Sequence, residues 1–454
     1  MQPDLAGLRG QLEKIVGAEH AVAGPAAAVK FSVDGVVPGV VVRPGTQDEA
    51  AKVLAACADA NAAVIPWGGG TAMGLGNPPR RADVAMPLDR LDRIVEFDAA
   101  NLCATVEAGV TLAALQTALA QKREMLPLDP PAENKVTVGG LVAANLSGPS
   151  RLLYGTARDW VLGMRVALPG GERIHCGGKV IKNVSGYDMS KLFIGSLGTL
   201  GIITEVTFKL LPLPATRAAV VGLFPDLARA TDVVRRALES VLLPEALDCL
   251  DADATALVAP RLGLETPAGA CGLAVAVAGS RETVERQVRD FSALFRDAGG
   301  RAMPLPDGRS VLAWDAIRNI FGLLPVRPAG RVLCKIAVPI GRTGDLFASA
   351  GALARRHELP VTVTAHAGSG VVWACYLLGP KAPPDEALAD ALEGLRREAE
   401  EAEGSLVLHD APAPLKARVD AWGKPHDGFG VMKRLKAEFD PRGLCNPGRF
   451  LGGL

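Results

Sequence analysis

PWGGGTAMGLG, at residues 66–76, is the stretch that decides the fold. Gly68, Gly69 and Gly70 carry no Cβ atom, so the backbone N–H groups of this stretch can turn inward and approach an anion closely. The apolar pair Val64–Ile65 predicts a strand that ends just before the glycines. The stretch therefore predicts a loop that binds a phosphate group.

Two common phosphate-binding loops do not fit this stretch. The Rossmann spacing G-x-G-x-x-G, counted from Gly68, meets Met73 where the third glycine should be, and counted from Gly74 it meets Pro79. The Walker A spacing G-x-x-x-x-G-K-[ST] fails as well. Its candidate elsewhere in the chain, Gly178–Lys179, has Arg173 where the first glycine should be. The sequence thus supports neither NAD in a Rossmann site nor ATP in a P-loop.

Composition limits the class of protein. The chain has 454 residues, is 49% hydrophobic, and balances 49 basic against 49 acidic side chains, so no overall charge attracts nucleic acid or an anionic membrane. The first twenty residues carry charges without an apolar signal region, and no apolar run is long enough to span a bilayer. The eight cysteines lie far apart, with no C-x-x-C, which argues against an iron–sulfur cluster held by this chain. We expect a cytoplasmic protein, at most peripheral at the inner membrane through its partners.

Hydrophobic periodicity predicts how the chain is organised. Strands and helices alternate over residues 38–212, with a capping box at Thr46-x-x-Glu49, a hairpin turn at Pro169–Gly171 and a half-buried strand at IITEVTFKL. The prolines of LLPLPAT indicate a domain boundary, and the strands that follow predict an antiparallel sheet with amphipathic helices. We expect an N-terminal helical segment (1–37), a cofactor domain (38–214), a substrate or cap domain (215–410) and a C-terminal segment (411–454) that returns to the cofactor domain.

Two further clusters of small residues lie in the predicted cofactor domain. They read TVGGLVAANLSG at 137–148 and IGSLGTLGIIT at 194–204. One glycine-rich loop is weak support for a ligand site, but three in one domain suggest a long ligand followed by backbone at several points. A dinucleotide has that length.

At this point the chain resembles a known family. VIPWGGGTAMG, TVGGLVAANLSG and GKVIKNVSGYDMSKLFIGSLGTLGIITEVTFKL (178–210) resemble the FAD-binding domain of the vanillyl-alcohol-oxidase/PCMH flavoproteins. The ending FDPRGLCNPGRFLGG resembles the D-2-hydroxyacid dehydrogenase branch of that family. The resemblance implies an α+β protein: a PCMH-type FAD-binding domain of two α/β subdomains, and a cap domain whose antiparallel sheet is flanked by helices.

The resemblance also implies which residues hold FAD. The first loop would bind the pyrophosphate, the second cluster would line the flavin and ribityl chain, and the third would lie near the adenine end. In this order the residues are Gly68, Gly69, Gly70 and Thr71; Thr137, Gly139, Gly140, Asn145, Ser147 and Gly148; and Gly201, Ile202 and Ile203. Some relatives attach the flavin through a histidine in the first loop; this loop has none, so the resemblance implies noncovalent FAD. The alternative is that these glycines only form turns.

Candidates for substrate chemistry follow from the same resemblance. Oxidation of a 2-hydroxyacid needs a cation for the carboxylate and a base for the hydroxyl proton. Arg318 and Lys335 match the basic positions of the family and are the carboxylate candidates. A solvated or salt-bridged pair is an equally open interpretation of these two residues from sequence alone.

The metal motifs of the family are incomplete in this chain. Where catalytic members carry H-x-G-D-G-N-x-H, residues 366–373 read HAGSGVVW, which keeps His366 but has Ser369 and Trp373 at the other ligand positions. In the later E-H-G motif, Leu408 replaces the glutamate and only His409 remains. We therefore expect no bound metal, with His366 as a hydrogen-bonded core or cleft histidine.

An intact flavin domain with a degraded metal site resembles the E subunits of bacterial glycolate oxidase. Leu197, where catalytic relatives usually have Glu, agrees with this resemblance. It implies a complex with a catalytic FAD subunit and an iron–sulfur subunit that together oxidise glycolate to glyoxylate. Two alternatives stay open: a stand-alone D-lactate or D-2-hydroxyacid dehydrogenase with His409 as base, and a non-catalytic structural or electron-relay flavoprotein.

Overall fold

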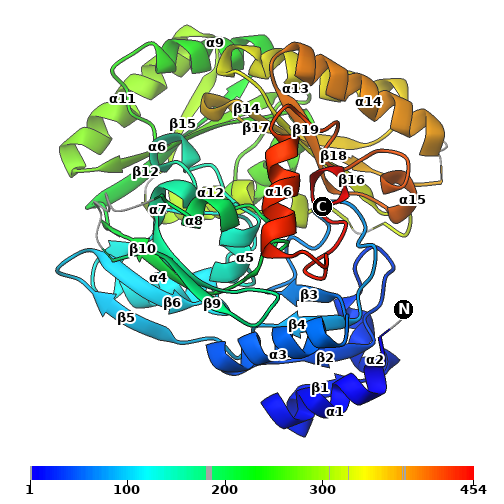
Figure 1. The fold of residues 1–454 in the computed structure, drawn as a ribbon. Helices are drawn as coiled ribbons and strands as arrows, with labels where there is room; N and C mark the ends of the chain where they lie inside the picture. Colours follow the sequence, from blue (N-terminus) through cyan, green and yellow to red (C-terminus); the bar gives the residue numbers. More distant parts are fainter. Residues whose placement is uncertain (1–2, 180–186, 306, 326, 381, 383–384) are drawn as a thin grey trace.

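The computed structural model describes residues 3–179, 187–305, 307–325, 327–380, 382 and 385–454. Residues 180–186 of the family-like run 178–210 lie outside the described residues. In Figure 1 two smaller sheets from the first half of the chain lie below, and one large sheet with its helices lies above. No helix of the described residues is long and apolar enough to cross a membrane.

The glycine loop follows a strand of the first small sheet. In spatial order the sheet contains β1 (Ala21–Ala23), β2 (Val40–Val42), β4 (Val84–Pro87) and β3 (Val64–Trp67). The last three strands are parallel, and β1 is antiparallel at the edge. Apolar side chains of α1 (Leu5–Val16) and α3 (Gln47–Asp59) pack against it, and α2 (Pro25–Ala28) is a single turn.

Only the Thr46 half of the predicted capping box is present at the start of α3, because the Glu49 carboxylate bonds one residue before the N-cap. The Thr46 hydroxyl accepts the Glu49 N–H at 3.1 Å, and the Glu49 carboxylate accepts the Gly45 N–H at 2.6 Å. The Glu49 N–H would otherwise lack a partner in the first turn of the helix, whereas Gly45 precedes the N-cap residue. The helix therefore begins where the sequence predicts it.

The second small sheet is antiparallel. In spatial order its strands are β5 (Ile94–Asp98), β6 (Cys103–Glu107), β10 (Ile202–Lys209), β8 (Val161–Ala167) and β9 (Arg173–Gly177). The predicted hairpin joins β8 to β9. The accompanying helices are α4 (Leu112–Ala120), α5 (Val138–Ala143), α6 (Arg151–Tyr154), α7 (Ala157–Trp160) and α8 (Ser190–Phe193), and β7 (Glu124–Met125) pairs with β11 (Leu211–Pro212).

The prediction of a half-buried strand at β10 is wrong. All its residues except Lys209 are buried. Val206 and Phe208 lie in one apolar core, while Glu205, on the other face, accepts a hydrogen bond from Gln47 of α3 at 2.9 Å. The strand is buried on both faces because the first subdomain packs over the face that the alternation pattern assigns to solvent.

The large sheet has eight antiparallel strands. In spatial order they are β15 (Arg301–Leu305), β12 (Thr216–Phe224), β14 (Cys271–Gly279), β13 (Ala246–Leu250), β17 (Val361–His366), β18 (Val371–Leu377), β16 (Arg331–Ala337) and β19 (Ser405–Asp410). One face packs on α9 (Leu227–Leu238), α11 (Arg281–Asp297), α13 (Thr343–Arg356) and α14 (Asp385–Glu401). The other face is covered at one end by α10 (Ala252–Val258) and α12 (Asp307–Arg318). The rest of that face is available for a site.

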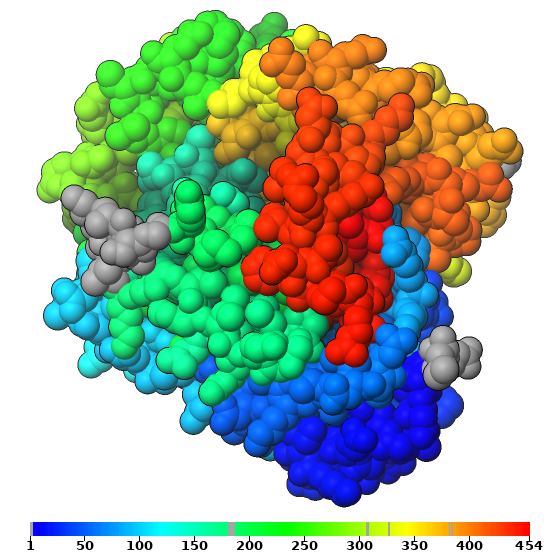
Figure 2. All heavy atoms as spheres, in the orientation of Figure 1, coloured from blue at the N-terminus to red at the C-terminus, as the bar shows by residue number. Residues whose placement is uncertain are grey.

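After β19 the chain passes through α15 (Ala413–Lys416) and α16 (Phe429–Phe439) and reaches the first sheet again. The Val64 N–H donates to the Leu444 carbonyl at 2.8 Å, and the Asn446 N–H donates to the Val64 carbonyl at 2.9 Å. Figure 2 shows this last segment, in red, lying across the boundary between the upper and lower parts. The C-terminal segment therefore pairs alongside β3, the strand that leads into the glycine loop, in a parallel bridge between Val64 and Cys445.

Candidate active site

The glycine loop has the backbone of an anion site. In the part of the chain that the structure describes, the N–H groups of residues 68–71 donate no hydrogen bond to another residue. Gly70 has φ +74°, a conformation that side-chain-bearing residues rarely adopt. Such a run of free donors is suited to the oxygens of a phosphate.

The second small-residue cluster forms the opposite wall of this loop. Thr137 caps α5, and its hydroxyl accepts the Gly140 N–H at 3.3 Å. A Cβ atom at Gly68 would lie 2.3 Å from that hydroxyl, and one at Gly69 would lie 1.6 Å from the Lys135 carbonyl. The two loops approach so closely because neither glycine has a side chain.

One cavity joins most of the predicted cofactor residues. It is lined by Gly68, Gly69, Gly70, Thr71, Thr137, Gly139, Gly140, Ile202 and Ile203. Gly201 does not line it; a Cβ there would lie 2.8 Å from Val166, so this glycine allows close packing of β10 on β8. Asn446 and Arg449 of the C-terminal segment also line the cavity, and the sequence reasoning missed both.

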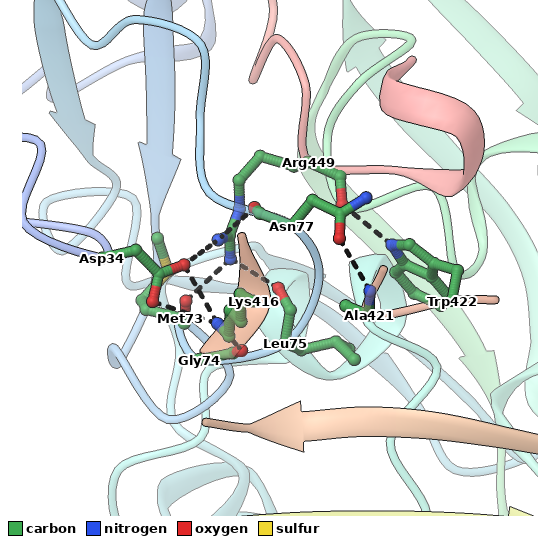
Figure 3. Close-up of polar contacts among 9 residues, drawn as sticks. All are labelled: Asp34, Met73, Gly74, Leu75, Asn77, Lys416, Ala421, Trp422 and Arg449. Atoms are coloured by element: carbon green, nitrogen blue, oxygen red, sulfur yellow. Dashed lines mark hydrogen bonds and ion pairs between the residues drawn. The ribbon is translucent and has the colours of Figure 1, made fainter. Parts of the chain in front are cut away.

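Arg449 holds the chain just after the glycine loop (Figure 3). Its guanidinium donates to the carbonyls of Met73 at 2.7 Å, Leu75 at 2.5 Å and Asn77 at 2.9 Å. Burial lowers the pKa of Arg449 to about 10, and Asp34 opposes this effect, so the side chain stays charged at neutral pH. The arginine fixes a glycine-rich segment that has little regular structure of its own.

A second buried cation completes this cluster. Lys416 donates to the Gly74 carbonyl at 2.6 Å, and it contacts the Asp34 carboxylate at 3.0 Å, which Arg449 also contacts at 3.3 Å. Two cations thus share one carboxylate. The motif at 439–453, which the sequence analysis used only for its resemblance, is a structural clamp on the cofactor loop.

We expect Arg449→Lys to lower the free energy of unfolding by about 2 kcal/mol, because lysine keeps the charge but cannot donate to three carbonyls and a carboxylate at once. Denaturant unfolding of the purified chain measures this change. Arg286→Lys, in an exposed ion pair of α11, is the matched control and should change stability by less than about 0.5 kcal/mol. Equal effects of both substitutions would contradict the clamp.

A second cavity, of about 230 Å³, lies between the cofactor domain and the open face of the large sheet. Thr71, Asn145, Ser147 and Gly148 line it from one side. Because Thr71 lines both cavities, an elongated ligand can extend from the glycine loop to the sheet. The three predicted catalytic residues, Arg318, Lys335 and His409, all line this second cavity.

Lys335 is the cation of this cavity that lacks a carboxylate. Its ammonium lies 5.6 Å from the centre of the Trp373 ring, and in the described part of the chain it makes no ion pair. Burial, and secondarily the charge of Arg151, lowers the pKa of Lys335 to about 8. A buried cation of this kind is stabilised by any anion that enters the cavity.

Arg318 is held differently. It ends α12 and pairs with Glu133 at 2.8 Å and with Asp315 at 3.1 Å, while its buried Nε has no partner among the described residues. Two of the three guanidinium nitrogens of Arg318 are therefore in salt bridges, as one of the two interpretations from sequence proposed. The third, Nε, stays available to a ligand.

His409 reaches the cavity through a β-bulge. Leu333 pairs with Asp410 and Cys334 with Leu408, so His409 between them has no partner in the ladder. Its ring packs edge-on against Trp373 with centroids 4.7 Å apart. Burial, with a smaller effect of the Lys335 charge, lowers the pKa of His409 to about 3.

His366 has a partner that the sequence did not reveal. Its Nδ1 lies 3.0 Å from both carboxylate oxygens of Asp248. The described residues contain no group of three or more His, Cys, Asp or Glu side chains that could hold a metal ion. Asp248 could have been found only by pairing two strands that lie more than a hundred residues apart in the chain.

The fold and the two cavities define a class: a two-domain flavoprotein oxidoreductase with a cofactor site beside a substrate cavity. A family model for an FAD binding domain matches residues 38–177, and one for the C-terminal domain of FAD linked oxidases matches residues 213–450. The chain belongs to the FAD linked oxidase family. It is an FAD-linked oxidoreductase.

Relatives and solved structures agree with this class. Glycolate oxidase subunit GlcD of Bacillus subtilis is 29% identical, over 98% of this chain and 96% of its own length. A probable mitochondrial D-lactate dehydrogenase of Danio rerio is 28% identical, over 91% and 84%. The crystal structure of p-cresol methylhydroxylase with substrate bound superposes with a TM-score of 0.78 at 18% identity, over 98% of this chain and 96% of that one. The predicted fold class is confirmed, and so is the resemblance to a glycolate oxidase subunit. The sequence analysis pointed to an E subunit, whereas this relative is a D subunit.

The described residues fit FAD. Free N–H groups face the glycine cavity, and three buried polar atoms at the two cavities lack partners among the described residues: Asn446 Oδ1, Arg449 Nε and Asn145 Oδ1. When bound, FAD supplies the hydride acceptor that amino-acid side chains cannot provide.

Proposed function

We propose that this chain is an FAD-binding subunit of a glycolate oxidase complex, which oxidises glycolate to glyoxylate and passes electrons to an iron–sulfur partner subunit. The observation that carries the proposal is Lys335, a buried cation without a carboxylate partner in a small cavity beside the cofactor site. The match to a glycolate oxidase subunit over almost the whole of both chains supports the choice of substrate.

In this proposal, residues 68–71 hold the pyrophosphate of FAD. Thr137, Gly139, Gly140, Asn145, Ser147 and Gly148 line the flavin and ribityl chain, and Ile202 and Ile203 lie near the adenine end. The contiguity of the two cavities at Thr71 supports this course. Gly201 contributes by allowing β10 to approach β8.

The substrate carboxylate binds the Lys335 ammonium, and Arg318 Nε is a second donor. The centre of the Trp373 ring lies 4.7 Å from that of His409 and 6.3 Å from that of Phe321. These three rings narrow one wall of the cavity, which suits a substrate as short as glycolate. These side chains orient the C2 hydrogen and exclude water, and a base takes the hydroxyl proton.

Anaerobic visible spectra of the holoprotein test this function. Glycolate should bleach the flavin of the isolated chain, or of the chain together with its proposed partners, faster than D-lactate does. Faster bleaching by D-lactate would favour the stand-alone dehydrogenase that the Danio rerio relative suggests. Flavin that no 2-hydroxyacid bleaches, in the isolated chain or in the complex, would contradict the proposal and support a structural or electron-relay role.

Substrate affinity should fall as the pH rises through about 8. Below that pH Lys335 is protonated and attracts the carboxylate, and above it the ammonium loses its charge. The dissociation constant of oxalate, measured by flavin difference spectra from pH 6 to 10, follows this titration. In Lys335→Arg the loss of affinity near pH 8 should disappear, because arginine stays charged over that range.

A further inference from the structure

Asp248 and His366 form a dyad on the face of the large sheet that borders the substrate cavity. The two residues are direct cross-strand partners in the pairing of β13 with β17. Asp248 is only 1% exposed, and both its carboxylate oxygens lie 3.0 Å from Nδ1 of His366. A carboxylate that is this deeply buried needs a hydrogen-bond donor, and the imidazole N–H is the donor present.

The carboxylate fixes which nitrogen carries the proton. An acceptor at Nδ1 selects the tautomer with hydrogen on Nδ1, so Nε2 keeps its lone pair when the ring is neutral. His366 lines the cavity, and in the described part of the chain Nε2 has no protein partner. The same arrangement orients the histidine base of serine hydrolases.

The other histidine of the cavity, His409, is a weak base. Burial and the nearby Lys335 lower the pKa of His409 to about 3. A general base works best when its pKa lies near the working pH, and the lone pair of so weak a base accepts a proton poorly. Trp373 also covers His409 on one side.

The other charged side chains that line this cavity come from two elements. They are Lys335 and Arg331 on β16, where Arg331 is ion-paired with Asp410, and Arg318 on α12. Asp129, in the loop before α5, lies nearby but does not line the cavity. Burial raises the pKa of Asp129 to about 6, while Ser150, Arg318 and His366 act in the opposite direction. Asp129 already accepts the Ser150 N–H at 3.1 Å, and it does not line the cavity.

We propose that His366, oriented by Asp248, accepts the hydroxyl proton of the 2-hydroxyacid. As the O–H bond breaks, the proton goes to Nε2 of His366, and the C2 hydrogen leaves with its electron pair to FAD. The O–H electrons form the new C=O bond of the 2-oxoacid. This assignment rests on the proposed oxidation of a 2-hydroxyacid, and it gives the proton to a residue other than His409.

The kinetic test uses His366→Gln and His409→Gln in the holoprotein, with flavin reduction by glycolate or D-lactate followed in stopped flow. His366→Gln should lower the limiting rate of reduction by about 10²- to 10⁴-fold with little change in substrate affinity. His409→Gln should lower the rate less. His175→Gln, exposed on β9, is the control for a histidine outside the cavity.

A second readout does not depend on turnover. With only six histidines in the chain, ¹⁵N-histidine NMR of the holoprotein can report the tautomer of each ring, and His366→Gln assigns the relevant signals. We expect His366 to carry its proton on Nδ1 when neutral, and Asp248→Asn to disturb that preference.

The outcomes separate the two proposals. A wild-type chain that is reduced normally, with His366→Gln equally fast, overturns the dyad and leaves the proposed function standing. A neutral His366 ring that carries its proton on Nε2 also overturns the dyad and leaves the proposed function standing. A wild-type holoprotein that no 2-hydroxyacid reduces, alone or in its complex, overturns the proposed function and the dyad together.

Discussion

Gly69→Ala will abolish stable FAD binding. A Cβ atom at this position would lie 1.6 Å from the Lys135 carbonyl oxygen and 2.7 Å from its carbon, so the glycine loop and the loop before α5 must separate. The obstacle is backbone on both sides, and no side chain can rotate away to relieve it. We expect a loss of about 3 kcal/mol or more, shared between folding and cofactor affinity.

The ratio of FAD to protein after purification, and the dissociation constant after reconstitution, measure this effect. Gly10→Ala is the matched control, because a Cβ at Gly10 of α1 meets nothing within 4 Å. That control should retain FAD and should be stabilised by about 0.5–1 kcal/mol, since alanine favours a helix over glycine. Full FAD occupancy in Gly69→Ala would show that the loops are not tightly apposed in solution.

Lys335→Met will lower kcat/KM for a 2-hydroxyacid by about 10²-fold or more. Methionine has nearly the same length and is apolar, so the buried substrate carboxylate would lose its one cation without a carboxylate partner. The loss should appear mainly as a higher KM. FAD should still bind, because the predicted pyrophosphate loop at residues 68–71 lines the glycine cavity, which Lys335 does not reach.

Steady-state kinetics at pH 7, with FAD content measured on the same samples, decide this prediction. Lys52→Met removes an exposed lysine of α3 and serves as the control for a lost surface charge. If Lys335→Met keeps the KM of the wild type, the carboxylate is bound elsewhere in the cavity. Arg318 Nε and Arg331 would then be the next residues to replace.

The cofactor and the chemical class could be predicted because the information is local. The strand and glycine loop at residues 64–76 and the capped, glycine-containing helix at residues 137–148 depend on the missing Cβ atoms and on neighbouring hydrogen bonds. Lys335 and His409 were found by resemblance in short motifs. The same comparison of short motifs showed that the metal motif is incomplete, because Ser369, Trp373 and Leu408 stand where the family has metal ligands.

Other features of the site depend on packing that no local pattern records. The alternation of β10 suggested a half-buried strand, yet Glu205 is covered by a helix more than 150 residues earlier in the chain. His409 enters the cavity because a bulge leaves it outside the ladder. Arg318 was equally open as ligand or ion pair until folding brought Glu133 beside it.

By itself, the sequence of this protein predicted glycine loops for a dinucleotide and, through its resemblance to a family, redox chemistry on a 2-hydroxyacid. Only the tertiary structure decided which side chains complete the site. Asp248 meets His366 across 118 residues of chain, and Arg449 clamps the segment at Met73 across 376. The physical reason is that strand register and domain contact bring these groups together, and neither is encoded in any short stretch of residues.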